Sequence, residues 1–271
     1  MATVKIKFAK EKETMLMTLY GRAVQSRWKN PIVRDPWAED AIQRIDYEFD
    51  KNYKGIFGKI VLDLGCMIVA TRAATFDRIT KQYLEEHPDA VVIYLGCGMD
   101  SRVYRVDPPA GVAWYNVDYP DVIDLYRQLY PERPGLHLIG SSLENSAWLD
   151  EVPKGRSALV IAEGVFMYLK EADVKALLNA LVRHFPRGQI VFDTLAPWIV
   201  KRGTNVGETG ASYKWTIDDP REIQQLEPRL DFIREYRTSD LVGFSRIHLV
   251  IRALHHLPRI KRMHYLLVYR F

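Results

Sequence analysis

The clearest pattern along the chain is a series of short apolar runs, separated by helix-like segments, from residue 90 onward. Residues 171–185, EADVKALLNALVRHF, carry apolar side chains every three or four positions, as one face of a helix does. Strands that alternate with helices are typical of a doubly wound parallel sheet. We therefore expect an α/β fold with a mostly parallel sheet, whose strands are VVIYLG, VAWYNVD, LHLIG, ALVIAEG and QIVFDT.

The first third of the chain has no alternating strand pattern. Residues 12–87 have helical spacing, interrupted by two Asx-Pro turns and by Gly55, which predicts an N-terminal helical layer. Within it, residues 61–70, VLDLGCMIVA, resemble a glycine turn but lack a second glycine. The apolar spacing instead predicts one long helix with a buried stripe made of Ile60, Leu64, Ile68, Phe76, Ile79 and Tyr83.

Arg72 lies inside this apolar stripe, four residues from Ile68 and four from Phe76. A guanidinium that faces a core needs an anion beside it. Two sources of that anion remain open: an internal ion pair with an acid such as Glu163 or Asp193, or a carboxylate of a bound ligand.

The part of the chain after Pro197 mixes turns, strands and a basic segment. The glycine-punctuated stretch KRGTNVGETGASYKW predicts a lid, followed by a polar helix from Asp219 and the strand LDFIREYR. A basic amphipathic segment from Asp240 leads to the terminal strand MHYLLVYRF. We expect one domain over residues 1–271, with a helical extension (1–89), a cofactor-binding core (90–194), a lid and substrate region (195–239), and a C-terminal helix and strand (240–271).

The first apolar run of the predicted sheet leads directly into Gly96, Cys97 and Gly98 and then into a helix start. Such glycines let the backbone turn sharply and approach a ligand closely. Asp118 ends the next apolar run, twenty residues after Gly98, at the spacing of an acid that accepts from ribose hydroxyls. The alternative is that Asp118 caps the helix that begins near Pro120.

A dinucleotide site would need a third glycine at position 101, which is Ser101 here and follows Asp100. An acid at a helix start repels a pyrophosphate but suits a ligand that carries a positive charge. The turn therefore favours S-adenosylmethionine (SAM) over NAD.

Glu163 follows the apolar run ALVIA and precedes Gly164, which places its carboxylate at the carboxyl end of a central strand. Ligands of open α/β sheets bind at that edge. A buried glutamate paired with Arg72 is the alternative, and it is compatible with a cofactor role. Tyr168 is expected to point into the same crevice, unless it is a core aromatic.

Composition adds limits rather than a function. The 271 residues carry a formal net charge of +4, with basic residues scattered, so neither nucleic acid nor membrane binding is indicated. Cys66 and Cys97 lie in apolar segments, and no apolar run reaches the length of a membrane span, so we expect a cytoplasmic protein. Dispersed histidines give no metal site, and no nucleophile motif occurs.

Several segments together resemble class I SAM-dependent methyltransferases of the leucine carboxyl methyltransferase group, in particular the bacterial polyketide O-methyltransferase branch. The resemblance covers nearly the whole chain. It implies a seven-stranded Rossmann-like methyltransferase sheet and rests on ETMLMTLYGRAVQSR, VATRAATFDRIT, LGCGMDSRVYRV, NVDYPDVIDLYRQL, IAEGVFMYL and IVFDTLAPW.

This resemblance implies roles for the matching residues. Arg72 would bind the methionyl carboxylate of SAM, the Gly96-Cys97-Gly98 turn would pass beneath the cofactor, and Asp118 would accept from the ribose. Glu163 would lie near the methionine portion, where Tyr168 could meet the substrate. Relatives have an Asp-Leu pair that contacts adenine, whereas this chain has Ser142 and Leu143.

The predicted reaction is methyl transfer to an oxygen of a small, polyketide-like acceptor. A carboxylate needs no general base because it is ionised at neutral pH, whereas a hydroxyl does, and the sequence indicates no base. Tyr20, Arg22 or Arg27 could hold such a carboxylate, with surface or structural roles as alternatives. Tyr213, Trp215 and Trp198 favour an aromatic acceptor.

Two other functions stay open at this point. An NAD-dependent oxidoreductase would need the missing third glycine and a proton donor. A SAM-binding protein of the same fold without turnover is compatible with every residue above. The oligomeric state is left open by the sequence.

Overall fold

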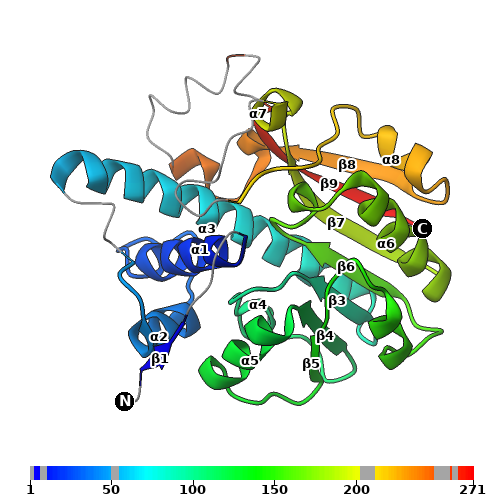
Figure 1. Ribbon diagram of the computed structural model, residues 1–271, viewed down its shortest axis with the longest axis horizontal. Helices are drawn as coiled ribbons and strands as arrows, with labels where there is room; N and C mark the ends of the chain where they lie inside the picture. Colours follow the sequence, from blue (N-terminus) through cyan, green and yellow to red (C-terminus); the bar gives the residue numbers. More distant parts are fainter. Residues whose placement is uncertain (1–2, 7–10, 50–54, 202–210, 247–256, 258–261) are drawn as a thin grey trace.

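The computed structural model describes residues 3–6, 11–49, 55–201, 211–246, 257 and 262–271. Its centre is a seven-stranded sheet with the order β5-β4-β3-β6-β7-β9-β8 (Figure 1). The first five strands in this order are parallel to one another, and β9 runs antiparallel to both of its neighbours, β7 and β8. The predicted mostly parallel α/β sheet is confirmed, and its strands are β3 (Val91–Leu95), β4 (Ala113–Asp118), β5 (Leu136–Gly140), β6 (Ala158–Ala162), β7 (Gly188–Leu195), β8 (Asp231–Arg237) and β9 (His264–Arg270).

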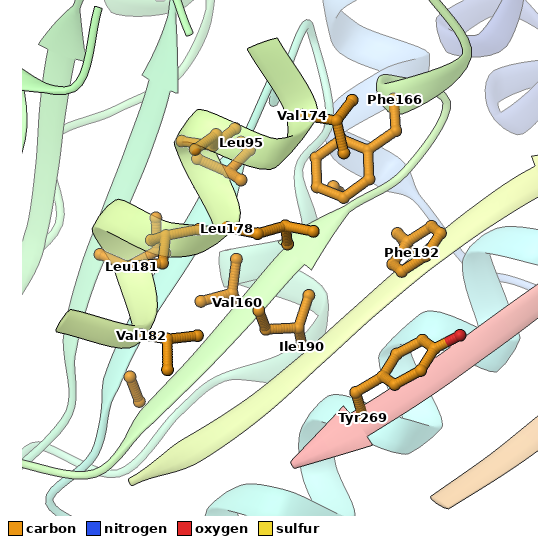
Figure 2. Close-up of a cluster of buried hydrophobic side chains, with 14 of the residues drawn as sticks. Leu95, Val160, Phe166, Val174, Leu178, Leu181, Val182, Ile190, Phe192 and Tyr269 are labelled. Carbon is orange, nitrogen blue, oxygen red and sulfur yellow. The ribbon is translucent and has the colours of Figure 1, made fainter. Parts of the chain in front are cut away.

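Both faces of the sheet are buried, because side chains alternate between the faces along each strand. On one face, strand residues such as Val160 and Ile190 pack against α6 (Glu171–His184), as Figure 2 shows. On the other face, residues such as Tyr94 and Ile161 pack against the C-terminal half of a long helix. Covering both faces excludes water and leaves the carboxyl ends of the parallel strands as the edge where a ligand can enter.

Three helices precede the sheet, as the spacing predicts: α1 (Glu11–Ser26), α2 (Pro36–Arg44) and α3 (Gly55–Glu86). The predicted stripe on α3 is only half right. Phe76 is fully buried, but Ile60 and Ile68 each keep 52% of their surface exposed. The reason is that the N-terminal half of α3 extends past the sheet, so that helical periodicity continues where the sheet no longer covers it (Figure 1).

Short elements connect the strands on the carboxyl side. They are α4 (Arg102–Val106), α5 (Pro120–Leu129), the 3₁₀ turns η1 (Ala147–Glu151) and η2 (Phe166–Tyr168), and α7 (Pro197–Lys201). A two-residue pairing of β1 (Val4–Lys5) with β2 (Ile45–Asp46) was not expected from the sequence.

The C-terminal part follows the prediction in its strands more than in its helices. The polar helix is the short α8 (Glu222–Leu226), and the two predicted strands form β8 and β9. Residues 202–210 of the predicted lid and 247–256 of the basic segment lie outside the described residues; Thr238–Asp240 and Phe244–Arg246 form the 3₁₀ turns η3 and η4. Among the described helices, none has the length and apolar character to cross a membrane.

Candidate functional site

The glycine turn and Asp118 form one hydrogen-bonded unit at the carboxyl ends of β3 and β4. The amide of Gly98 donates to Asp118 Oδ2 at 2.7 Å. Gly96 and Gly98 have φ angles of 56° and 49°, in the left-handed region that favours glycine. A Cβ on Gly96 would also lie 2.5 Å from Cγ2 of Val165. The turn therefore requires glycine for both conformation and space.

Asp118 is buried and accepts a second bond, at 2.7 Å, from the amide of Tyr119 to Oδ1. Burial raises the pKa of Asp118 to about 6, and the two amide donors only partly oppose this. The helix-capping alternative is wrong, because α5 has Tyr119 at its N-cap position. Each carboxylate oxygen keeps a lone pair beyond its amide bond, so Asp118 can accept from two further donors.

A cavity of about 420 Å³ opens beside this unit. Its size is within the range of small-molecule sites. It brings together most of the predicted cofactor residues, which are Arg72, Gly96, Cys97, Gly98, Asp118, Leu143 and Glu163, and it adds the substrate-side candidate Tyr168. Much of the remaining wall is apolar and contains Met15, Met17, Val69, Val122 and Met167. A wall of this kind excludes water around a few polar anchors.

Arg72 forms internal ion pairs, one of the two sources of an anion that the sequence left open. Its Nε donates to Glu163 Oε1 at 2.8 Å, and one terminal nitrogen donates to Asp193 Oδ2 at 3.2 Å. Burial alone would lower the pKa of Arg72, but Glu163 and Asp193 outweigh it and raise the pKa. The side chain keeps 16% exposure and lines the cavity. Arg72 can therefore bind a ligand carboxylate in addition to its two internal partners.

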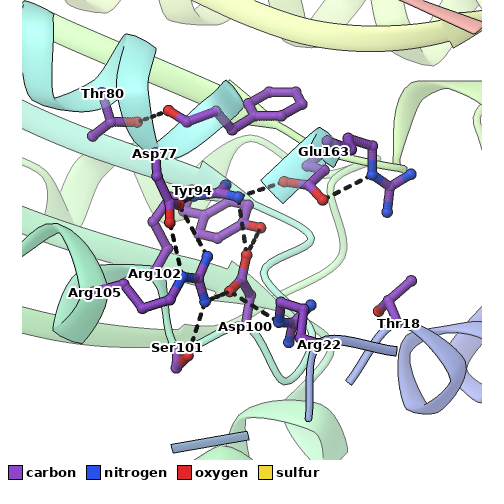
Figure 3. Close-up of polar contacts among 12 residues, drawn as sticks. Thr18, Arg22, Asp77, Thr80, Tyr94, Asp100, Ser101, Arg102, Arg105 and Glu163 are labelled. Atoms are coloured by element: carbon purple, nitrogen blue, oxygen red, sulfur yellow. Dashed lines mark hydrogen bonds and ion pairs between the residues drawn. The ribbon is translucent and has the colours of Figure 1, made fainter. Parts of the chain in front are cut away.

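Arg102 connects the glycine turn to Glu163, and sequence reasoning missed it. This fully buried guanidinium binds Asp77 at 2.8 Å, Asp100 at 3.1 Å, and Glu163 (Figure 3). The segment RVYRV gives no sign that its first arginine is buried, because its guanidinium lies against side chains from other elements, Phe76 of α3 and Tyr94 of β3. Glu163 is thus held between Arg102 and Arg72.

Asp100 does not supply a free negative charge for a ligand, which corrects the expectation from its place before the helix. It accepts from Arg105 at 2.6 Å and from the Tyr94 hydroxyl at 2.7 Å, and it also pairs with Arg102. Burial opposes ionisation, yet the charges of Arg105, Arg22 and Arg102 hold the pKa of Asp100 well below its usual range. Its negative charge is neutralised by arginines within the fold.

Arg22 lines the cavity but has partners of its own. Its Nε donates to Asp35 at 3.0 Å, a terminal nitrogen donates to the Met99 carbonyl at 2.7 Å, and only 2% of the residue is exposed. Burial would lower the pKa of Arg22, but Asp100 and Asp35 raise it. Arg22 thus has the structural partners of its alternative role, while it also lies at the cavity.

Arg27 and Tyr20 are absent from the described lining of the cavity. Arg27 is half-exposed and pairs with Glu39 at 3.2 Å, and the Tyr20 ring stacks on Phe49 with centroids 5.2 Å apart. Both side chains therefore make the surface or structural contacts that were the alternative to binding a substrate carboxylate.

Of the pair Ser142 and Leu143, which was expected near adenine, only Leu143 lines the cavity. Ser141 and Leu143 line it, whereas Ser142 does not, and the Ser142 hydroxyl accepts from the amide of Glu144 at 3.3 Å. Of the three aromatics proposed for the acceptor, Tyr213 lines the cavity, with its ring 5.4 Å from that of Tyr168. Trp215 is instead buried in the core, and Trp198 does not line the cavity among the described residues.

His264 also lines the cavity, and the sequence analysis missed it as well. Its Nε2 lies 2.7 Å from Asp193 Oδ2, the same oxygen that Arg72 contacts. The register pairs Leu195 at the end of β7 with His264 at the start of β9. Because β9 is antiparallel to β7, its first residue comes to the carboxyl edge where ligands bind.

The described residues contain no group of three His, Cys, Asp or Glu side chains that could hold a metal ion. Cys97 is a free, buried thiol whose pKa is raised well above its usual value, first by burial and then by the charges of Asp118 and Asp100. It therefore fills space in the turn rather than acting as a nucleophile.

Comparisons with known proteins agree with this geometry. The sequence pattern of the family described as leucine carboxyl methyltransferase matches residues 15–182. The tetracenomycin polyketide synthesis O-methyltransferase TcmP of Streptomyces glaucescens is 38% identical over 266 residues, 96% of each chain. The SAM-dependent methyltransferase dpfgK of Gibberella zeae is 33% identical, over 84% of this chain and 82% of its own.

Among solved structures, a candidate methyltransferase from Thermobifida fusca YX superposes with a TM-score of 0.60. The alignment covers 97% of this chain and 94% of that one at 14% sequence identity. At that identity the likeness concerns the fold alone.

Proposed function

The chain belongs to the leucine carboxyl methyltransferase family of SAM-dependent methyltransferases, and on that premise we propose that it methylates a carboxylate oxygen of a small aromatic, polyketide-like acid. The observation that carries the proposal is the bond from Gly98 to Asp118, with Arg72 on the wall of the same cavity. Together they offer an acceptor for hydroxyls and a cation for a carboxylate beside an apolar wall.

The residues fit SAM group by group. Asp118 would accept from the two ribose hydroxyls with the lone pairs that its amide donors leave free. Arg72 would bind the methionyl carboxylate, and Glu163 would lie beside the methionyl ammonium. Gly96 and Gly98 would let the backbone approach the ligand where a Cβ would obstruct it.

When bound, SAM supplies an activated methyl group, so the protein has to place the acceptor oxygen and exclude water. A carboxylate is already ionised at neutral pH and needs no proton removed. The aromatic pair Tyr168 and Tyr213 would pack against a planar acceptor, and the polyketide acceptor class is supported by the name of TcmP.

An NAD-dependent oxidoreductase is less well supported by the same site. Ser101, at the position of the third glycine, is buried and donates to Asp35 at 2.5 Å. The Gly98 amide of the turn, which could otherwise donate to a pyrophosphate oxygen, already donates to Asp118. The proposal also includes a cytoplasmic location, which the buried free thiols of Cys66 and Cys97 support.

The test is calorimetric titration with SAM, S-adenosylhomocysteine (SAH) and NAD, followed by an acceptor screen with methyl-labelled SAM. We expect micromolar binding of the two adenosyl ligands, no binding of NAD, and label transferred to fused-ring aromatic acids. Binding of NAD alone would refute the proposal. Tight SAM binding with no transfer to any acid or phenol would support the non-catalytic alternative.

A further inference from the structure

The permanent cations at the cavity all have carboxylate partners within the chain. Lys12 pairs with Asp121 at 2.7 Å, and Arg22 and Arg72 have the partners described above. Arg72 is in addition the residue assigned to the methionyl carboxylate. Among the described lining residues, no permanent cation is left for a second carboxylate, that of the acceptor.

His264 is the described lining residue that can add a positive charge, because imidazole exchanges a proton near neutral pH. It is half-buried, with 13% of its side chain exposed. Its partner Asp193, together with Arg72, also acts on the pKa of Tyr213, which is raised first by burial. His264 and the aromatic pair Tyr168 and Tyr213 thus line the same cavity.

The partner of His264 fixes which ring nitrogen carries hydrogen. Asp193 is fully buried and accepts from the Gly164 amide at 2.5 Å and from Arg72 at 3.2 Å. Burial opposes its ionisation, but Arg72 and His264 lower its pKa to about 2, so that Asp193 is an acceptor only. The hydrogen between the pair therefore belongs to Nε2, and Nδ1 remains for a ligand.

We propose that His264 is the residue that binds the carboxylate of the acceptor. On protonation, Nδ1–H donates to one carboxylate oxygen while Asp193 holds the ring by Nε2–H, which leaves the other oxygen for methylation. The inference rests on the proposed function and assigns its acceptor-binding residue. Asp193 is a positioning residue, because it acts on the acceptor through His264.

The charged group that contacts the ring is Asp193, at 2.7 Å, and Arg72 and Glu163 pair with one another beside it. Arg262, two residues before His264, is paired with Glu235 at 3.0 Å. An incoming carboxylate adds a negative charge, so acceptor binding should take up a proton near neutral pH and weaken as pH rises.

The experiment titrates the SAH complex of the full chain with 2-naphthoate, and with 2-naphthol as the uncharged counterpart, in buffers of different ionisation enthalpy. We expect proton uptake on naphthoate binding at pH 7, absent in His264→Gln, with affinity reduced about 10- to 100-fold. In turnover assays of His264→Gln, KM for the acceptor should rise more than kcat falls. SAH affinity should stay within about twofold of wild type, a range too small to represent a lost charged hydrogen bond.

His184→Gln is the matched control, because His184 contacts the Val152 carbonyl and lies away from the cavity lining. Asp193→Asn should reduce the proton uptake, and if it fails to fold, His264→Gln still decides. Naphthoate binding without proton uptake, or unaffected in His264→Gln, would overturn the inference. Methylation of naphthol with a lower kcat in the variant would overturn it too, by making His264 a general base. Failure of the wild type to bind SAH would instead refute the proposed function.

Discussion

The amide of Gly98 and the carboxylate of Asp118 are joined by a hydrogen bond of 2.7 Å across two neighbouring parallel strands. The bond links the turn that would pass beneath the cofactor to the acid that would hold its ribose. The position of the acid therefore depends on the backbone of the turn, and a change in either should disturb both.

Asp118 should make cofactor binding depend on pH. Its pKa of about 6 in the free protein means that it is largely protonated at pH 5, when it can no longer accept from two ribose hydroxyls. Bound donors favour the ionised form, so SAH affinity should rise about tenfold from pH 5 to pH 7 and then level off. The amino group of SAH, like that of any free amino acid, titrates well above this window.

Calorimetry of SAH binding at pH 5, 6 and 7 measures this dependence. Asp118→Asn should bind more weakly at pH 7 by about 1.5 to 3 kcal/mol and show a flat profile. Asp121→Asn is the control, because Asp121 is a half-exposed acid near the same ligand end. An unchanged slope in Asp118→Asn would show that another group titrates.

Gly96→Ala should destabilise the protein by about 2 to 4 kcal/mol. The left-handed φ of 56° costs an alanine about 1 to 2 kcal/mol, and the new Cβ would collide with Val165, which adds an overpacking cost. Gly155→Ala is the matched control, since its φ of 86° is also left-handed but no atom lies within 4 Å of the Cβ position.

Urea denaturation of the two alanine variants, and a double-mutant cycle with Val165→Ala, separates the two costs. The coupling energy from the cycle should equal the steric cost of the contact with Val165. The cost of Gly96→Ala that remains in the Val165→Ala background should equal the conformational cost. If Gly96→Ala costs no more than Gly155→Ala, the close contact with Val165 has no energetic weight.

Arg102→Met should cost about 3 to 5 kcal/mol of unfolding free energy, because it leaves Asp77, Asp100 and Glu163 buried without this cation. Arg127→Ala, which removes an exposed pair with Asp124, should cost less than about 1 kcal/mol. Chemical denaturation measures both. SAH affinity should also fall in Arg102→Met, since Glu163 loses one of its two arginine partners; equal stability of the two variants would contradict a structural role for the network.

The sequence predicted the parts of the site that depend on order along the chain. A glycine turn after one strand and an acid after the next must meet at the same edge of a parallel sheet, so Gly98 and Asp118 could be placed together. The same reasoning placed Glu163. It could also foresee the anion beside Arg72, although not that two acids would bind it together.

The rest depends on contacts between distant segments. His264 reaches Asp193 because the last strand inserts between β7 and β8 in antiparallel direction, and nothing in a terminal apolar run specifies that position. Arg102 is buried against Phe76 of α3 and Tyr94 of β3, which are distant from it or from one another along the chain. The exposed half of the α3 stripe could not be predicted either. Periodicity shows which face of the helix is apolar, but not how far the sheet extends beneath it.

Asp193 should also stabilise the fold in a way that acid removes. Its pKa is about 2 in the folded protein against about 3.9 in an unfolded chain, so its pairs contribute about 2 kcal/mol above pH 4, and this is lost as pH falls toward 2. Asp193→Asn should therefore lower the free energy of unfolding by at least this amount at pH 7, and the difference from wild type should narrow below pH 4. Asp231→Asn, on β8, is the control, because Asp231 is exposed and lies 3.7 Å from an equally exposed Arg270. Denaturation curves at pH 7, 4 and 3 test the sign directly: a difference that stays constant between pH 7 and pH 3 would mean that Asp193 acts through packing rather than through its charge.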